Sequence, residues 1–126
     1  MKIEFQKKSS ALIVKIQGEI DHHCAAIIRE KIEKEYQKSD TKNLVFDFEF
    51  VTFMDSSGIG MIIGRYKNVL ACGGKTAVVN ANEKVSKIFQ MAGMQKIIPQ
   101  YQSITEALQQ MGGMKNAVWK WNDNTI

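Results

Sequence analysis

The stretch Met54-Asp55-Ser56-Ser57-Gly58-Ile59-Gly60 decides the fold, because it stands where a strand-like run gives way to a helix-like run. Ahead of it, apolar residues alternate from Leu44 to Phe50, which is the period of a β-strand. After it, apolar residues recur every three or four positions, as on one face of an α-helix. The two serines therefore lie at a predicted helix N-terminus, where backbone N–H groups lack intrahelical acceptors and the helix dipole is positive. Such a position favours a negative charge.

The rest of the chain alternates between the same two periods. In chain order, the predicted elements are strands over residues 2–7 and 12–17, a helix between Asp21 and Ser39, a strand over 44–50, the helix that follows Asp55 and stops at Cys72, a strand over 76–79, a helix over 83–92, a short strand at 97–99 and a helix over 104–111. The order β-β-α-β-α-β-α-β-α predicts an α/β fold, with a mixed sheet of about five short strands and about four helices. The first two strands form an antiparallel hairpin, and right-handed crossovers place most helices on one face.

Local signals add further expectations to this pattern. Asp21 is a candidate N-cap for the first helix. Asp47 and Glu49 interrupt the third strand and predict that it leaves the sheet there. Arg65 and Lys67 of the second helix are expected to be solvated.

The second helix contains three glycines, Gly58, Gly60 and Gly64. In a helix interior each glycine costs about 1 kcal/mol relative to alanine, so their presence needs a physical reason. Two reasons stay open: close packing of this helix on the sheet, or the close approach of a partner.

Composition and charge exclude several classes of protein. The 126 residues suit one domain, and the charge of +4 is scattered over the chain without a basic run, which argues against nucleic-acid binding. No apolar run approaches the ~20 residues that span a membrane, and the N-terminus has no signal-peptide pattern. Cys24 and Cys72 form no metal-ligand or disulfide pattern. We therefore expect a cytoplasmic protein with reduced thiols and no membrane association.

Three separated blocks of sequence resemble the anti-sigma factor antagonists of the STAS domain family. They are Gly18-Glu19-Ile20-Asp21-His22-His23, then Phe53-Met54-Asp55-Ser56-Ser57-Gly58-Ile59-Gly60, then Gly64-Arg65-Tyr66-Lys67. A bare Asp-Ser-Ser-Gly is a weak signal, but three blocks with the expected elements between them are specific. The resemblance is strongest to the sporulation-type antagonists of Bacillus and its relatives. It implies a single STAS-type domain over residues 1–113 and leaves a tail over residues 114–126, with Trp119 and Trp121, outside the pattern.

The resemblance implies a regulatory protein without catalytic residues, cofactor or metal. Ser56, directly after the aspartate, matches the serine that the family phosphorylates. In the family, the unphosphorylated antagonist binds an anti-sigma factor that is also a serine kinase with bound nucleotide, and thereby releases a sigma factor. In the sporulation type this is sigma F. Phosphorylation switches the antagonist off, and a serine phosphatase restores it. We expect the chain to be a monomer.

The same resemblance predicts the surface that meets the partner. It comprises Glu19, Asp21, His22, Asp55, Ser56, Ser57, Gly58, Ile59 and Gly60. A phosphate on Ser56 would add about −1.5 to −2 charges there, next to residues that are already acidic. At a helix N-terminus we expect it to meet free N–H donors, so that the fold tolerates it.

Several of these residues have a structural interpretation as well. Ser56 alone would serve as an N-cap, and Ser57 as a cap or a first-turn residue. Asp55 could either cap the helix or orient the Ser56 hydroxyl during phosphate transfer, and both interpretations stay open. His22 and His23 lack a third ligand, which argues against a metal site.

Other functions fit the sequence less well. A serine hydrolase would have Gly-x-Ser-x-Gly at this turn, and neither Ser56 nor Ser57 has glycines on both sides. A P-loop would need a lysine and a different glycine spacing. The alternatives that stay open are a stress-response antagonist and a STAS module that binds a nucleotide or acts as a scaffold.

Overall fold

Five strands form one mixed sheet in the computed structural model, which describes residues 1–112. The elements are β1 (Lys2–Lys8), β2 (Ala11–Ile20), α1 (Ala25–Ser39), β3 (Asn43–Met54), α2 (Ser56–Ala71), β4 (Thr76–Val79), α3 (Glu83–Met91), the 3-10 helix η1 (Met94–Lys96), β5 (Gln100–Tyr101) and α4 (Ile104–Gln110). The predicted order of strands and helices is confirmed, with η1 as an addition. The predictions for residues 114–126 lie outside the described residues.

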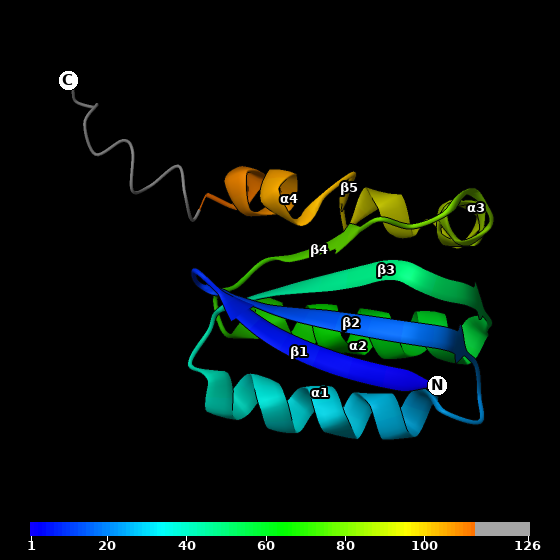
Figure 1. Cartoon of the computed structure of the whole chain (residues 1–126), viewed down its shortest axis with the longest axis horizontal. Helices are drawn as coiled ribbons and strands as arrows, with labels where there is room; N and C mark the ends of the chain where they lie inside the picture. Colours follow the sequence, from blue (N-terminus) through cyan, green and yellow to red (C-terminus); the bar gives the residue numbers. More distant parts are fainter. Residues whose placement is uncertain (113–126) are drawn as a thin grey trace.

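The strands follow one another across the sheet in sequence order, β1-β2-β3-β4-β5. β1 pairs with β2 in antiparallel fashion, as the hairpin prediction requires, and the other neighbours are parallel. Each parallel pair is joined by a helical crossover (Figure 1). Because β2 and β3 are parallel neighbours, the segments that leave their carboxyl ends emerge at the same edge of the sheet.

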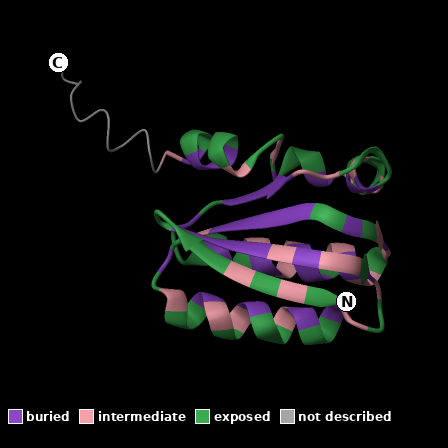
Figure 2. Ribbon diagram, viewed as in Figure 1, coloured by how far each residue is buried: buried purple, intermediate pink, exposed green. Residues whose placement is uncertain are grey.

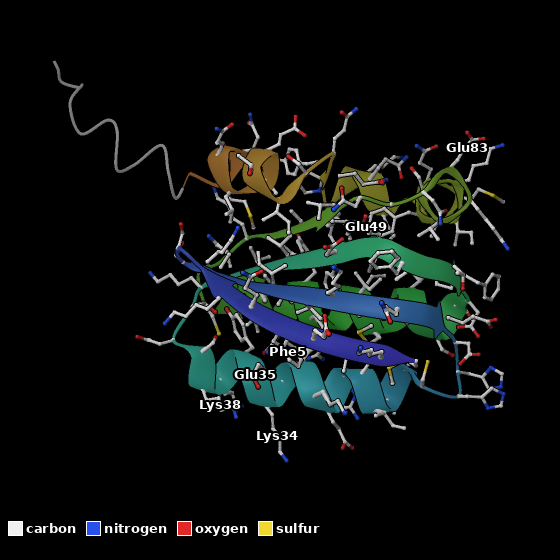
Figure 3. All side chains as sticks on the ribbon, viewed as in Figure 1. Phe5, Lys34, Glu35, Lys38, Glu49 and Glu83 are labelled. Atoms are coloured by element: carbon white, nitrogen blue, oxygen red, sulfur yellow. The ribbon has the colours of Figure 1, made fainter. Side chains whose placement is uncertain are left out.

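The hydrophobic core lies on both faces of the sheet, and most of it lies on one. α1, α2 and α3 contribute to the larger cluster, whereas α4 packs on the opposite face over β4 (Figures 1 and 2). The predicted apolar stripe of α1 is confirmed, because its buried residues are Ala25, Ile28, Ile32 and Tyr36. Phe5 of the edge strand packs against the same cluster, and Lys34 and Lys38 point away from it into solvent (Figure 3). None of the described helices has the length and hydrophobicity that crossing a bilayer requires.

The third strand is longer than predicted. β3 continues past Asp47 and Glu49 to Met54, and its last pair with β2 joins Met54 to Ile20. Asp47 stays in the sheet because its Oδ1 accepts hydrogen bonds from Asn80 Nδ2 at 3.1 Å and from Glu49 N at 3.1 Å. A buried acid whose hydrogen bonds are satisfied does not end a strand.

The last strand was predicted at the wrong residues. Ile97 and Ile98 end the 3-10 turn, and their N–H groups both donate to the carbonyl oxygen of Met94, at 3.0 Å and 2.9 Å. Pairing with β4 begins only after Pro99, at Gln100 and Tyr101. β5 is therefore two residues long and leaves part of the neighbouring strand edge unpaired.

Arg65 was expected to be a solvated helix residue, and the structure shows that it is buried, at 8% exposure. It occupies the face of α2 that also buries Met61, Ile62 and Val69. Its Nη1 donates to Glu33 Oε2 of α1 at 2.6 Å, while Arg29 Nη1 donates to Glu33 Oε1 at 3.3 Å. The Arg65–Glu33 contact ties α2 to α1, and the Arg29–Glu33 pair lies within α1. Lys67 is exposed as predicted.

The glycines of α2 have different explanations. A Cβ on Gly58 would lie 2.4 Å from the carbonyl oxygen of Ile20, closer than real Cβ atoms come to backbone. At Gly60 and Gly64 a Cβ would meet nothing within 4 Å. Packing of the helix on β2 therefore explains Gly58 only, and Gly60 and Gly64 leave open space beside the helix.

We predict opposite effects for two alanine substitutions only two residues apart in α2. Gly58→Ala should lower the free energy of unfolding by about 1–3 kcal/mol, because the methyl group must push α2 away from β2. Gly60→Ala, the matched control, should raise it by about 0.5–1 kcal/mol, because alanine loses less backbone entropy in a helix. Urea unfolding of both variants measures the difference. Equal effects of the two substitutions would contradict the close approach at Gly58.

Candidate functional site

The predicted partner surface lies where β2 and β3 end side by side. Glu19 pairs with Phe53 and Ile20 with Met54, so both strands stop at one level. The N–H of Asp55 donates to the carbonyl oxygen of Ile20 at 3.3 Å. Residues 19–24, which lead into α1, thus lie against residues 55–60, which open α2. We call these two segments together the junction.

The Asp55 side chain connects the two segments of the junction. Its Oδ1 accepts hydrogen bonds from Ser57 N at 2.9 Å and from Gly58 N at 3.2 Å, which makes Asp55 the N-cap of α2. Its Oδ2 accepts a hydrogen bond from His22 N at 3.1 Å and lies 3.4 Å from His22 Nδ1. Of the two interpretations left open by the sequence, the capping role is the one that the structure shows.

These contacts also set the ionisation of Asp55. Desolvation acts to raise its pKa, but the hydrogen bonds from Gly58, His22 and Ser57 outweigh that effect and hold the pKa below its ordinary value. The folded structure therefore favours the ionised carboxylate of Asp55 over its protonated form. Because the folded-state pKa is the lower one, this stabilisation is present above the unfolded-state pKa and is lost as pH falls through the folded-state pKa.

Asp21 does not cap α1, contrary to the prediction. The helix begins at Ala25, and Cys24 stands in the N-cap position without a capping side-chain hydrogen bond. Asp21 instead closes the preceding turn, where its Oδ1 accepts from His23 N at 2.9 Å and its carbonyl oxygen accepts from Ala25 N at 2.9 Å. Desolvation raises the pKa of Asp21, yet its hydrogen bonds with His23 and Cys24 bring it below its ordinary value. The carboxylates of Asp21 and Asp55 are thus both held in their charged form.

Ser56 is the first residue of α2, and its side chain is exposed. Within the described part of the chain its hydroxyl makes no hydrogen bond, so Asp55 and not Ser56 supplies the helix cap. Ser57 is a first-turn residue whose N–H donates to Asp55. An exposed hydroxyl with no structural role is chemically available for modification.

A shallow groove of about 300 Å³ lies between the N-terminal halves of α1 and α2. Its lining includes Ala25 and Arg29 from α1 and Ser57, Gly60 and Met61 from α2. Because Gly60 has no side chain, α2 does not project into the groove at this position. The open space beside Gly60 therefore belongs to a surface that another molecule can enter.

The structure brings the residues of the predicted partner surface together, but not all of them are exposed to solvent. Glu19, His22, Ser56 and Gly60 are exposed. Gly58 is buried against β2, and Ile59 packs partly on the core. Gly58 thus contributes to the junction through its close packing against β2.

Sequence reasoning missed two contacts around the junction. One is the hydrogen bond from the His22 backbone to Asp55, which no local sequence signal encodes because the residues are far apart in sequence. The other is the Arg29–Glu33–Arg65 arrangement. Its signals were present, since Arg29 and Glu33 are four residues apart on a helix and Arg65 falls in line with Ile62 and Val69.

The His22 and His23 rings lie next to each other, with centroids 4.0 Å apart and planes tilted by 37°. Over residues 1–112 no group of three or more His, Cys, Asp or Glu side chains is arranged to hold a metal ion.

Comparison with known proteins gives one family. The sequence profile of the STAS domain matches residues 2–107. An anti-sigma F factor antagonist from Paenibacillus polymyxa is 35% identical over 111 residues, which cover 88% of this chain and 95% of the relative. An anti-sigma-B factor antagonist from Bacillus subtilis is 31% identical over 97 residues, covering 76% of this chain and 86% of the relative.

Solved structures agree with this assignment. The unphosphorylated form of the anti-sigma factor antagonist SpoIIAA superimposes with a TM-score of 0.75 at 28% identity, covering 89% of this chain and 97% of that one. The phosphorylated form of SpoIIAA, a Bacillus cell fate determinant, gives a TM-score of 0.66 at 27% identity, covering 86% and 98%. The fold is thus that of proteins known both with and without a phosphate.

Removal of the Asp55 carboxylate should make stability less dependent on pH. We expect Asp55→Ala to unfold more easily than the wild type at neutral pH, and the gap to narrow as pH falls, because the wild type loses its ionised cap. Asp55→Asn, the control, keeps an oxygen that can accept from Ser57 and Gly58, and should lose less stability at neutral pH. Urea unfolding across the acid range tests this. A gap between wild type and Asp55→Ala that stays constant with pH would contradict it.

Proposed function

This chain belongs to the STAS domain family, and we propose that it is an anti-sigma factor antagonist controlled by phosphorylation of Ser56. In its unphosphorylated form it binds an anti-sigma factor that is also a serine kinase carrying a nucleotide, and so releases a sigma factor. Phosphorylation of Ser56 abolishes binding, and a serine phosphatase restores it. The relatives are regulatory binding proteins, so the chain is not an enzyme.

One observation carries the proposal: Ser56 is exposed at the start of α2, and its hydroxyl makes no hydrogen bond within the described residues. A kinase can reach this hydroxyl without unfolding the helix, because Asp55 already holds the cap. The neighbouring Ser57 is only partly exposed and lies toward the groove. These positions favour Ser56 over Ser57 as the phosphoacceptor.

The expectation that a phosphate would meet several free N–H donors at the start of α2 needs correction. Asp55 already accepts from the N–H groups of Ser57 and Gly58, and the N–H of Ile59 donates to the carbonyl oxygen of Asp55. Arg29, near the groove, is paired with Glu33. A phosphate on Ser56 would therefore stand beside the Asp55 carboxylate with little to neutralise it. Its charge would act mainly on an approaching partner.

This arrangement supports a switch by electrostatic repulsion and bulk without refolding. The junction already carries the charges of Asp21 and Asp55, both of which the fold holds ionised. Adding about −1.5 to −2 charges to that surface penalises any partner that docks an acidic or desolvated group there. A tenfold loss of affinity needs only about 1.4 kcal/mol.

We further propose that the released sigma factor is of the sigma F type, in the sporulation pathway. The relative named for sigma F covers 88% of this chain, against 76% for the relative named for sigma B. The two identities, 35% and 31%, are close, so a stress-response antagonist of the sigma-B kind is the second candidate. Binding of the purified chain to anti-sigma factors of both types separates the two candidates. Preference for the sigma-B type would overturn the sporulation assignment.

Incubation with the cognate anti-sigma kinase and ATP should add a single phosphate, on Ser56. Mass spectrometry of proteolytic fragments identifies the residue. Ser56→Ala should remain unmodified and bind the kinase persistently, whereas the phosphorylated wild type should bind at least tenfold more weakly, because the new charge stands at the docking surface.

Ser57→Ala is the matched control for this experiment, because it removes the adjacent hydroxyl and leaves Ser56 in place. It should accept the phosphate as the wild type does. A phosphate found on Ser57, or equal affinity of the phosphorylated and unphosphorylated chains, would refute the proposed switch.

A further inference from the structure

Arg29 is the only charged residue among those that line the groove between α1 and α2. Both helices begin at the edge of the sheet where β2 and β3 end (Figure 1). Ser57 and Gly60 line the groove and also belong to the junction. The cation of Arg29 therefore stands in a surface that is continuous with the proposed phosphorylation site.

The space between Ser56 and the groove is open. Ser56 precedes Gly60 by four residues in α2, and residues four apart share a face of a helix. Because Cβ atoms in a helix tilt toward its N-terminus, a side chain on Gly60 would project toward Ser56. A Cβ at Gly60 would meet no atom within 4 Å. A group attached to the Ser56 hydroxyl can therefore extend over Gly60 into the groove.

Arg29 is held weakly in the unphosphorylated chain. Its Nη1 donates to Glu33 Oε1 at 3.3 Å, and the two side chains are 44% and 37% exposed. Exposed ion pairs between residues four apart on a helix contribute little to stability, because water screens them. Glu33 has a closer partner in the buried Arg65, whose Nη1 donates to Oε2 at 2.6 Å. Arg29 can therefore leave Glu33 without leaving that carboxylate unpaired.

The charges around Ser56 favour the groove as the place for a phosphate. The carboxylates of Asp21 and Asp55 are both held ionised at the junction, and they repel a second anion. The N-terminus of α1 has no side-chain cap, and none of the described residues accepts a hydrogen bond from the N–H groups of Ala26 and Ile27. A phosphate is therefore repelled by the carboxylates and attracted by the groove.

We propose that a phosphate on Ser56 lies over Gly60 in the groove and is bound by Arg29, which exchanges Glu33 for it. This inference rests on the proposed phosphorylation of Ser56. A guanidinium group can bind two phosphate oxygens through two parallel N–H donors, whereas Arg29 makes one contact with Glu33. The phosphate has little to neutralise it until Arg29 moves. After the exchange it occupies the groove as well as adding charge to the junction, so a partner side chain cannot enter.

Phosphorus-31 NMR tests the exchange on the full-length chain, with phosphoserine incorporated at position 56 during translation. The pH midpoint at which the phosphate loses its second proton is measured in the wild-type background, in Arg29→Gln and in Arg29→Lys. Because a neighbouring cation stabilises the dianion, Arg29→Gln should raise this midpoint by about one pH unit at low salt. Arg29→Lys keeps the charge but not the paired donors, so its midpoint should lie between the other two.

Lys31→Gln is the matched control, since Lys31 is an exposed cation two residues further along α1 and does not share the face of Arg29. It should keep the wild-type midpoint, and the circular dichroism of all variants should match that of the wild type. Equal midpoints in the wild type and Arg29→Gln would refute the proposal. An equal rise in Arg29→Gln and Lys31→Gln would refute it too, because it would show a general effect of charge.

The result does not depend on a kinase, because translation installs the phosphate. A chain that shows the shift with Arg29→Gln but is never modified by the anti-sigma kinase would contradict the proposed function and not the contact with Arg29. A chain that the kinase modifies on Ser56, but whose midpoint ignores Arg29, would contradict the contact alone.

Discussion

The carboxylate of Asp55 is the contact on which the candidate site depends. It accepts hydrogen bonds from the first turn of α2 and from the backbone of His22, so it joins the two segments that leave the parallel strands β2 and β3. The absence of a side chain at Gly58 lets α2 come close enough to Ile20 for this arrangement. Because Asp55 supplies the helix cap, the Ser56 hydroxyl has no structural role. A residue that the fold does not need is one that can be modified without cost to the fold, which is what a reversible regulatory site requires.

Much of the fold was predictable, because its long elements carry strong periodic signals. The buried stripe of α1, the parallel strands and the position of Ser56 at the start of α2 all follow from apolar spacing and from one strand-to-helix turn. The short or polar elements were less predictable. The sequence predicts that β3 ends at Asp47, but Asn80, distant in sequence, donates a hydrogen bond to its carboxylate inside the sheet. The apolar run Ile97-Ile98-Pro99 predicts a strand, but the N–H groups of Ile97 and Ile98 donate to the carbonyl oxygen of Met94 in a 3-10 turn.

The candidate site was likewise predictable in part. Sequence alone placed Asp55 and Ser56 at the helix start, but could not decide which of them caps it, since either side chain suits the position. Only the meeting of residues 19–24 with residues 55–60 shows that Asp55 has two sets of donors. The N–H groups of Ser57 and Gly58, expected to be free for a phosphate, are occupied because Asp55 caps the helix. Contacts between residues more than 30 positions apart carry no local signature, and here the contact of His22 with Asp55 adds to the local hydrogen bonds that lower the pKa of Asp55.

Glu33 binds Arg65 of α2 and Arg29 of α1 at the same time, close to the groove that separates the two helices. The Arg65–Glu33 contact joins the two helices that wall the groove. It therefore opposes a partner side chain that would push the helices apart. In the switch that we propose, discrimination among similar partners would then arise from size and shape at the groove, and the on–off decision from charge beside it.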